Sequence, residues 1–184
     1  MSGDEKLNRK TIFLRAVVPC ALIISLSFNL HYYVNLRTEN ENVVNTMRTK
    51  ALAVYGSEVA AIAYFLEEYL NTLNLDLIDK EVSWGIARAE WEAGIFMKGL
   101  DEDSGLMYYE LSRTAKTLEN YFVWNIYGPL NATKIETMAQ LLSAIGAAFT
   151  GFDHIENQDP LKHLGPPSVD EVINYCRQIQ AVVQ

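Results

Sequence analysis

Residues 52–73 read LAVYGSEVAAIAYFLEEYLNTL, and their apolar side chains recur at alternating steps of three and four. This spacing predicts one face of an amphipathic helix, which we expect to extend over residues 42–75. The face consists of Leu52, Tyr55, Val59, Ile62, Leu66, Tyr69 and Leu73. Such a face must pack against other elements, and no alternating run in the sequence predicts a strand, so the fold class is all-α.

Two more helices are expected before the next proline, Pro129. The first begins near Asp79 as its cap and ends near Gly99. Its expected buried face is Trp84, Ala87, Trp91 and Ile95. The other follows a turn at residues 101–105, and its expected buried face is Met107, Leu111, Thr114, Leu118 and Tyr121.

The last two helices have clear starts. Asn131 suits an N-cap, and Ser168 with Glu171 forms a capping box. The fourth helix has the stripe Ile135, Met138, Leu142, Ile145, Phe149 and Phe152, with a small side at Gly146 where another helix can approach closely. The fifth has the stripe Val169, Val172, Cys176, Ile179 and Val183. Short connections between five amphipathic helices predict an antiparallel bundle.

Upstream of these helices, residues 16–36 contain no charged side chain. About 21 helical residues reach roughly 30 Å, the thickness of a bilayer's hydrocarbon core, so we expect a transmembrane helix. Lys6, Arg9, Lys10 and Arg15 precede it, whereas Arg37 alone follows closely. This asymmetry predicts a cytoplasmic tail over residues 1–15 and an extracytoplasmic domain over residues 37–184.

The polar residues of the expected span leave alternatives open. Ser25, Asn29 and Tyr32 share one helical face and suit hydrogen bonds to a partner helix in the membrane. Alternatively, Asn29 already lies at headgroup depth, where water satisfies it. A cleavable signal peptide is a further alternative, because Ser25-Leu26-Ser27 resembles a cleavage site, although Pro19 and the continuing uncharged run argue for a retained anchor.

The charge balance restricts the partners. The chain has 15 Lys and Arg residues against 23 Asp and Glu, and beyond residue 36 the counts are 11 and 21. This acidity disfavours nucleic acid and anionic lipid headgroups as partners of the external domain. Of the two cysteines, Cys20 lies in the expected span, and Cys176 lies on an apolar stripe, which favours a buried thiol over an intermolecular disulfide.

Catalytic and cofactor signatures are absent from the sequence: it has no Glu-x-x-His pair, Cys-x-x-Cys pair, nucleophile elbow or phosphate-binding glycine loop. A metal or acid-base site requires carboxylates and imidazoles close together. The segment after the fourth helix offers such groups in Asp153, His154, Glu156 and His163. We favour the alternative that they form a solvated loop. We expect no cofactor and no enzymatic activity.

Trp84 and Trp91, with Arg88 and Glu92 near them, allow two interpretations. The residues line a ligand cleft in which Arg88 holds a carboxylate, or the two indoles belong to the core while Arg88 pairs with Glu92. We favour the core, because apolar side chains at i and i+7 on one helix face are usually buried.

Asn131-Ala132-Thr133 forms a glycosylation sequon on the side of the membrane expected to be extracytoplasmic. Its place at a helix start makes it accessible, and whether it is modified stays open.

Together these features favour a membrane-anchored helical protein that acts as an accessory or structural subunit of a larger membrane assembly. Contact with lipid and with a protein partner, or with further copies of the chain, would use the span and the first long helix. The alternative is an extracytoplasmic sensor or small-ligand-binding module that signals through a partner, because about 15 cytoplasmic residues offer no output domain.

Overall fold

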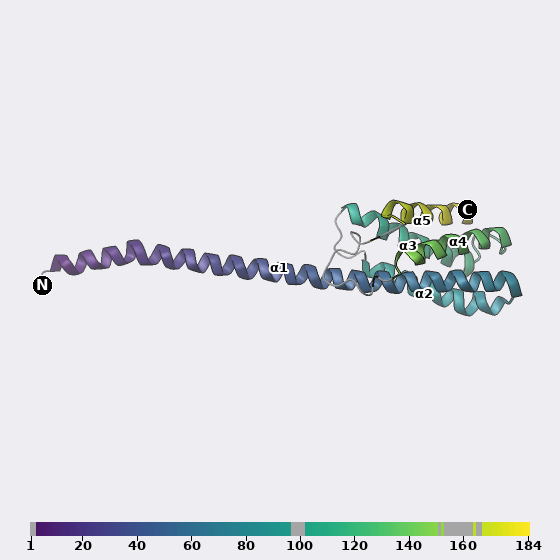
Figure 1. Ribbon diagram of the computed structural model, residues 1–184, viewed down its shortest axis with the longest axis horizontal. Coiled ribbons are helices and arrows are strands. Elements are labelled where there is room, and N and C mark those ends of the chain that lie inside the picture. The colour runs from purple at the N-terminus through teal and green to yellow at the C-terminus, as the bar shows by residue number, and fades with distance from the viewer. Residues whose placement is uncertain (1–2, 97–101, 151, 153–163, 165–166) are drawn as a thin grey trace. The chain divides into compact units, whose positions relative to one another are not determined.

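The computed structural model describes residues 3–96, 102–150, 152, 164 and 167–184, with side chains from residue 22 onward except at 95–96 and 102–104. The described residues form helices and their connections without a strand, which confirms the all-α prediction. The chain divides into two compact units, Met1–Val43 and Val44–Gln184 (Figure 1). Helix α1, Gly3–Thr72, contributes residues to both units.

The second unit is built on the apolar face of α1 that the spacing of residues 52–73 predicts. Leu52, Tyr55, Val59, Ile62 and Leu66 are fully buried there, and Tyr69 is partly buried. The expected last member, Leu73, is exposed. The reason is that α1 ends at Thr72, and Leu73 turns out of the helix with a φ of 54°.

The next helix differs from its prediction in both its start and its buried face. It begins with a π-helical segment, η1, Leu77–Val82, and continues as α2, Ser83–Phe96, so Asp79 does not cap it. The hydroxyl of Ser83 donates a hydrogen bond of 2.9 Å to the carbonyl oxygen of Ile78, five residues back. The buried face is Ile78, Val82, Ile86, Ala89 and Ala93.

The remaining helices follow their predicted faces. Helix α3 runs over Glu102–Phe122, so residues 102–105 of the expected turn belong to the helix. Helix α4 runs over Ala132–Ala148 and α5 over Val169–Val183. Of the stripe positions predicted for these three helices, all are fully buried except the partly buried Val169. The capping box of Ser168 and Glu171 is present.

Close packing joins these helices into a bundle. A Cβ at Gly85 would lie 2.8 Å from Cγ1 of Ile62, so α2 packs directly against α1. A Cβ at Gly146 would lie 2.9 Å from Cβ of Ala60, which confirms the close approach predicted for the small side of α4. Helix α3 packs against α2 and α5, and α5 packs against α4 (Figure 1).

Within the described residues, no helix has a stretch that is both long and apolar enough to span a membrane. The first six residues of the expected span, 16–21, lie outside the described side chains. The expected transmembrane helix therefore gains no support from the structure and stays a prediction.

Candidate functional site

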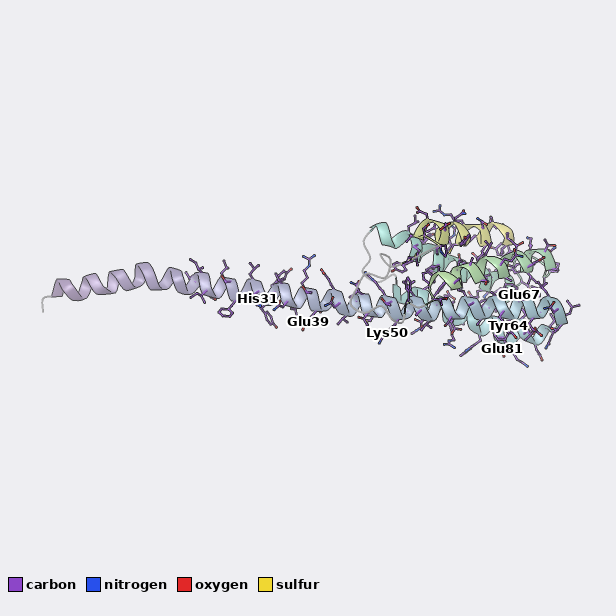
Figure 2. The ribbon with its side chains drawn as sticks, in the orientation of Figure 1. His31, Glu39, Lys50, Tyr64, Glu67 and Glu81 are labelled. Atoms are coloured by element: carbon purple, nitrogen blue, oxygen red, sulfur yellow. The ribbon has the colours of Figure 1, made fainter. Side chains whose placement is uncertain are left out.

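In the unit Met1–Val43, helix α1 has apolar side chains that are largely uncovered. Every described side chain from residue 22 to residue 40 is exposed. Figure 2 shows two of them, His31 and Glu39, projecting from the ribbon of the helix. The large apolar members are Leu22, Ile23, Ile24, Leu26, Phe28, Leu30, Tyr32, Tyr33, Val34, Leu36 and Val43.

The expected partner face, Ser25, Asn29 and Tyr32, lies on this exposed part of α1. Several other polar groups of the same segment are bonded within the helix. The hydroxyl of Ser27 donates to the carbonyl oxygen of Ile23 at 2.9 Å, and Arg37 Nε donates to Glu41 Oε1 at 2.9 Å.

The unit Val44–Gln184 carries an open groove of about 840 Å³ between the beginning of its α1 part and the end of α2. The groove is mainly apolar, with one cation and one carboxylate among the described lining residues. These are Val44, Met47 and Arg48 from α1, and Ala87, Glu90, Trp91 and Gly94 from α2. A volume of this size accommodates a small apolar molecule or a few side chains of a bound peptide.

The expected burial of Trp84 and Trp91 is wrong, because 66% of Trp84 and 72% of Trp91 is exposed. The smaller residues of α2 face the core instead: Ala89 and Ala93 are buried where α2 packs in the bundle. Trp91 lines the groove, whereas Trp84 is not among its described lining residues. Trp91 therefore fits the cleft interpretation, whereas Trp84 does not.

The expected pairing of Arg88 with Glu92 gives way to a contact between helices. Arg88 Nη2 lies 2.8 Å from Oε1 of Glu58 on α1, whose side chain is almost fully buried. Burial raises the pKa of Glu92, a rise that Arg88 opposes and Glu58 reinforces. Arg88 therefore joins α2 to α1, and it does not line the described part of the groove.

A buried polar network between α3 and α5 was not predicted. Arg177 Nε donates to Oε1 of Glu110 at 3.0 Å, and Gln180 Nε2 donates to the other carboxylate oxygen at 3.0 Å. Gln180 also contacts Oγ1 of Thr114 at 3.3 Å. Only Thr114 stood on a predicted stripe, and nothing in the sequence links residues about 70 positions apart. Both carboxylate oxygens of Glu110 are hydrogen-bonded, which suits a structural role.

Cys176 is buried beside this network, as its position on the apolar stripe predicts. Burial raises the pKa of its thiol to about 12, which keeps it protonated at neutral pH. A protonated, enclosed thiol is a poor nucleophile, so Cys176 acts as a small apolar residue.

The weak metal-site candidates Asp153, His154, Glu156 and His163 lie outside the described residues. Where the structure does describe the chain, it brings together no group of three or more histidines, cysteines or carboxylates suited to a metal ion.

Asn131 caps α4 as predicted: its side-chain oxygen accepts a hydrogen bond of 3.1 Å from the backbone N–H of Lys134. Its own backbone N–H donates to the hydroxyl of Tyr121 at 3.1 Å. Because the side chain is exposed, the sequon is accessible, and its modification stays a prediction.

Comparisons of the chain with family models, with curated proteins and with solved structures found no match.

Proposed function

We propose that the chain is a single-pass membrane protein whose external helical domain serves as an accessory or structural subunit of a larger membrane assembly. The observation that supports this best is the exposed apolar part of α1, residues 22–36, which continues the uncharged stretch that begins at residue 16. Apolar side chains in such numbers, left uncovered on one helix, suit lipid or another protein better than water.

The proposed orientation places residues 1–15 in the cytoplasm and residues 37–184 outside. It follows from the basic residues before the apolar stretch. The acidic external domain would make its contacts with protein, since its charge disfavours nucleic acid.

Membrane retention is tested by carbonate extraction of membranes that contain the full chain. We expect the chain to stay in the pellet, and Ile23→Lys with Ile24→Lys to release it, because each lysine at the centre of a span costs about 3 kcal/mol. The matched control is Glu41→Lys with Asn42→Lys, outside the proposed span. A wild-type chain found in the supernatant contradicts the anchor.

The orientation is tested with the sequon. When the chain is synthesised with microsomes, an external domain exposes Asn131 to the glycosylation machinery, so a glycan-dependent mass shift is expected. Asn131→Gln provides the control that abolishes the shift. Protease digestion of the C-terminal domain in sealed microsomes would contradict the orientation.

A second candidate function is that of a ligand-binding module, which the groove around Trp91 favours. The hydrophobic dye ANS provides a probe for the full chain in mild detergent. Binding in the groove predicts a rise in dye fluorescence that Trp91→Ser removes and that the equally exposed Trp84→Ser preserves. Equal losses in the two variants, or no rise at all, would exclude the groove as the binding place.

A further inference from the structure

Seven exposed side chains of α1 in the unit Met1–Val43 form a seam with steps of four and three: Leu22, Leu26, Asn29, Tyr33, Leu36, Asn40 and Val43. The repeat averages 3.5 residues over about three heptads, which is the period of a left-handed coiled coil. Residues 37–43 are otherwise polar or charged, and their one apolar side chain, Val43, falls on the seam.

The seam contains two asparagines whose amides have no partner among the described residues. In heptad terms Asn40 occupies an a position and Asn29 a d position. An asparagine at an a position pairs best with the same residue of a parallel, in-register helix, and it thereby fixes register and oligomeric state. Within lipid, Asn29 would otherwise keep an unsatisfied amide.

We infer that two copies of the chain pair through this seam as a parallel, in-register coiled coil of their α1 helices, with Asn29 opposite Asn29 and Asn40 opposite Asn40. A second copy is the occupant that the seam fits best, because it supplies an asparagine at both required heights. The inference deepens the proposed function and rests on it in one respect: a shared membrane orientation makes the two helices parallel.

The residues flanking the seam agree with self-pairing. In a parallel pair, a g position of one helix faces the e position of the next heptad on the other. Here Tyr32 at g would face Arg37 at e. Arg37 is bonded to Glu41 of its own helix, which leaves its guanidinium plane free to lie over the Tyr32 ring as a cation–π contact. No two like charges meet at this point.

The test is disulfide crosslinking of the full chain in its membranes. Val43→Cys on the seam is compared with Thr38→Cys, an exposed f position on the opposite side. Both carry Cys20→Ser, and the buried Cys176 is retained. We expect Val43→Cys to form a dimer about tenfold faster than Thr38→Cys, since a disulfide requires Cα atoms within about 7 Å. Equal rates, or no crosslink at either position, would overturn the inference.

A second pair of variants tests the asparagine contact in the Val43→Cys background. Asn40→Lys puts like charges opposite each other and should slow crosslinking about tenfold. Asn42→Lys, at a c position away from the seam, introduces the same charge and should leave the rate unchanged. Similar effects of the two lysines would contradict the proposed register.

Carbonate extraction of the same membranes separates the two proposals. If carbonate releases the chain but seam-specific crosslinks still form, the pairing is supported and the membrane anchor is contradicted. If the chain resists carbonate extraction but forms no seam-specific crosslinks, the membrane anchor is supported and the pairing is contradicted.

Discussion

Arg177 Nε on α5 and Oε1 of Glu110 on α3 lie 3.0 Å apart, and only 3% of Glu110 is exposed. The carboxylate is thus held inside the bundle by the guanidinium at its edge and by the amide of Gln180. Removing one partner of an ion pair whose acid is buried destabilises the fold, because the remaining charge then loses its hydrogen bond.

Arg177→Met should therefore lower the free energy of unfolding by about 2 kcal/mol. The measurement is denaturant unfolding of the full chain in mild detergent, followed by circular dichroism. Arg113→Met, on the exposed side of α3, is the matched control and should change stability by less than about 0.5 kcal/mol. Adding Glu110→Gln to Arg177→Met should recover part of the loss, and the absence of recovery would contradict the role of the pair.

The pH dependence of stability should reflect Cys176. Its pKa rises from 9.0 to about 12 in the fold through burial, so the unfolded chain loses the thiol proton first as pH rises. Stability is then full below about pH 9 and falls between about pH 9 and 12, by up to about 1.4 kcal/mol per pH unit. Burial raises the pKa of Tyr55 as well, which adds to the fall above about pH 10.

Cys176→Ala separates the two alkaline contributions. It should flatten the profile between about pH 9 and 10, where Tyr55 does not yet titrate in the unfolded chain, apart from a pH-independent loss for the small cavity. Unfolding measured at a series of pH values tests this. A slope unchanged by the substitution would mean that the thiol does not titrate as its burial requires.

Replacing Gly146 and Gly94 by alanine should change the stability of the fold in opposite directions. A Cβ at Gly146 would meet Cβ of Ala60 at 2.9 Å, so Gly146→Ala should destabilise the chain by about 1–3 kcal/mol through forced separation of α4 and α1. Among the described residues, a Cβ at Gly94 of α2 meets nothing within 4 Å, so Gly94→Ala should stabilise the chain by about 0.5–1 kcal/mol. Thermal unfolding of both variants measures the difference, and a shared sign would refute the close helix contact.

The exposed tryptophans should matter little for stability. Trp91→Ala is expected to change the free energy of unfolding by less than about 0.5 kcal/mol, because the indole is largely in solvent. Ile86→Ala, on the buried face of the same helix, should cost about 2–5 kcal/mol. Denaturant titration compares the two, and a larger cost for Trp91 would restore the core interpretation.

The sequence predicts the helix faces well where large aliphatic residues and caps agree. Leu52, Ile62 and Leu142 lie where the spacing puts them, and Ser168 and Asn131 cap their helices as expected. These features are local, so they can be derived from residues three or four apart.

The α2 face and the candidate groove could not be derived in this way. The i, i+7 spacing of Trp84 and Trp91 suggested that both indoles were buried, whereas α2 meets α1 through the uncovered backbone of Gly85 and buries Ile86 and Ala89 instead. The contacts of Glu110 with Arg177 and of Glu58 with Arg88 join distant positions, and charge alone does not identify the partners. The groove depends on how two helices meet, which periodicity does not encode.

The π-helical segment Leu77–Val82 affects how the chain tolerates changes in its length. Hydrogen bonds that reach five residues back accommodate one residue more than an α-helical path, and the surplus sits on the surface, where Asp79, Lys80 and Glu81 are exposed. Loss of one of these three would close the segment into an ordinary turn with Ile78 and Val82 still facing inward. The same deletion inside α2 would rotate everything beyond it by about 100°. A one-residue deletion should therefore be tolerated at residues 79–81 and not tolerated within α2.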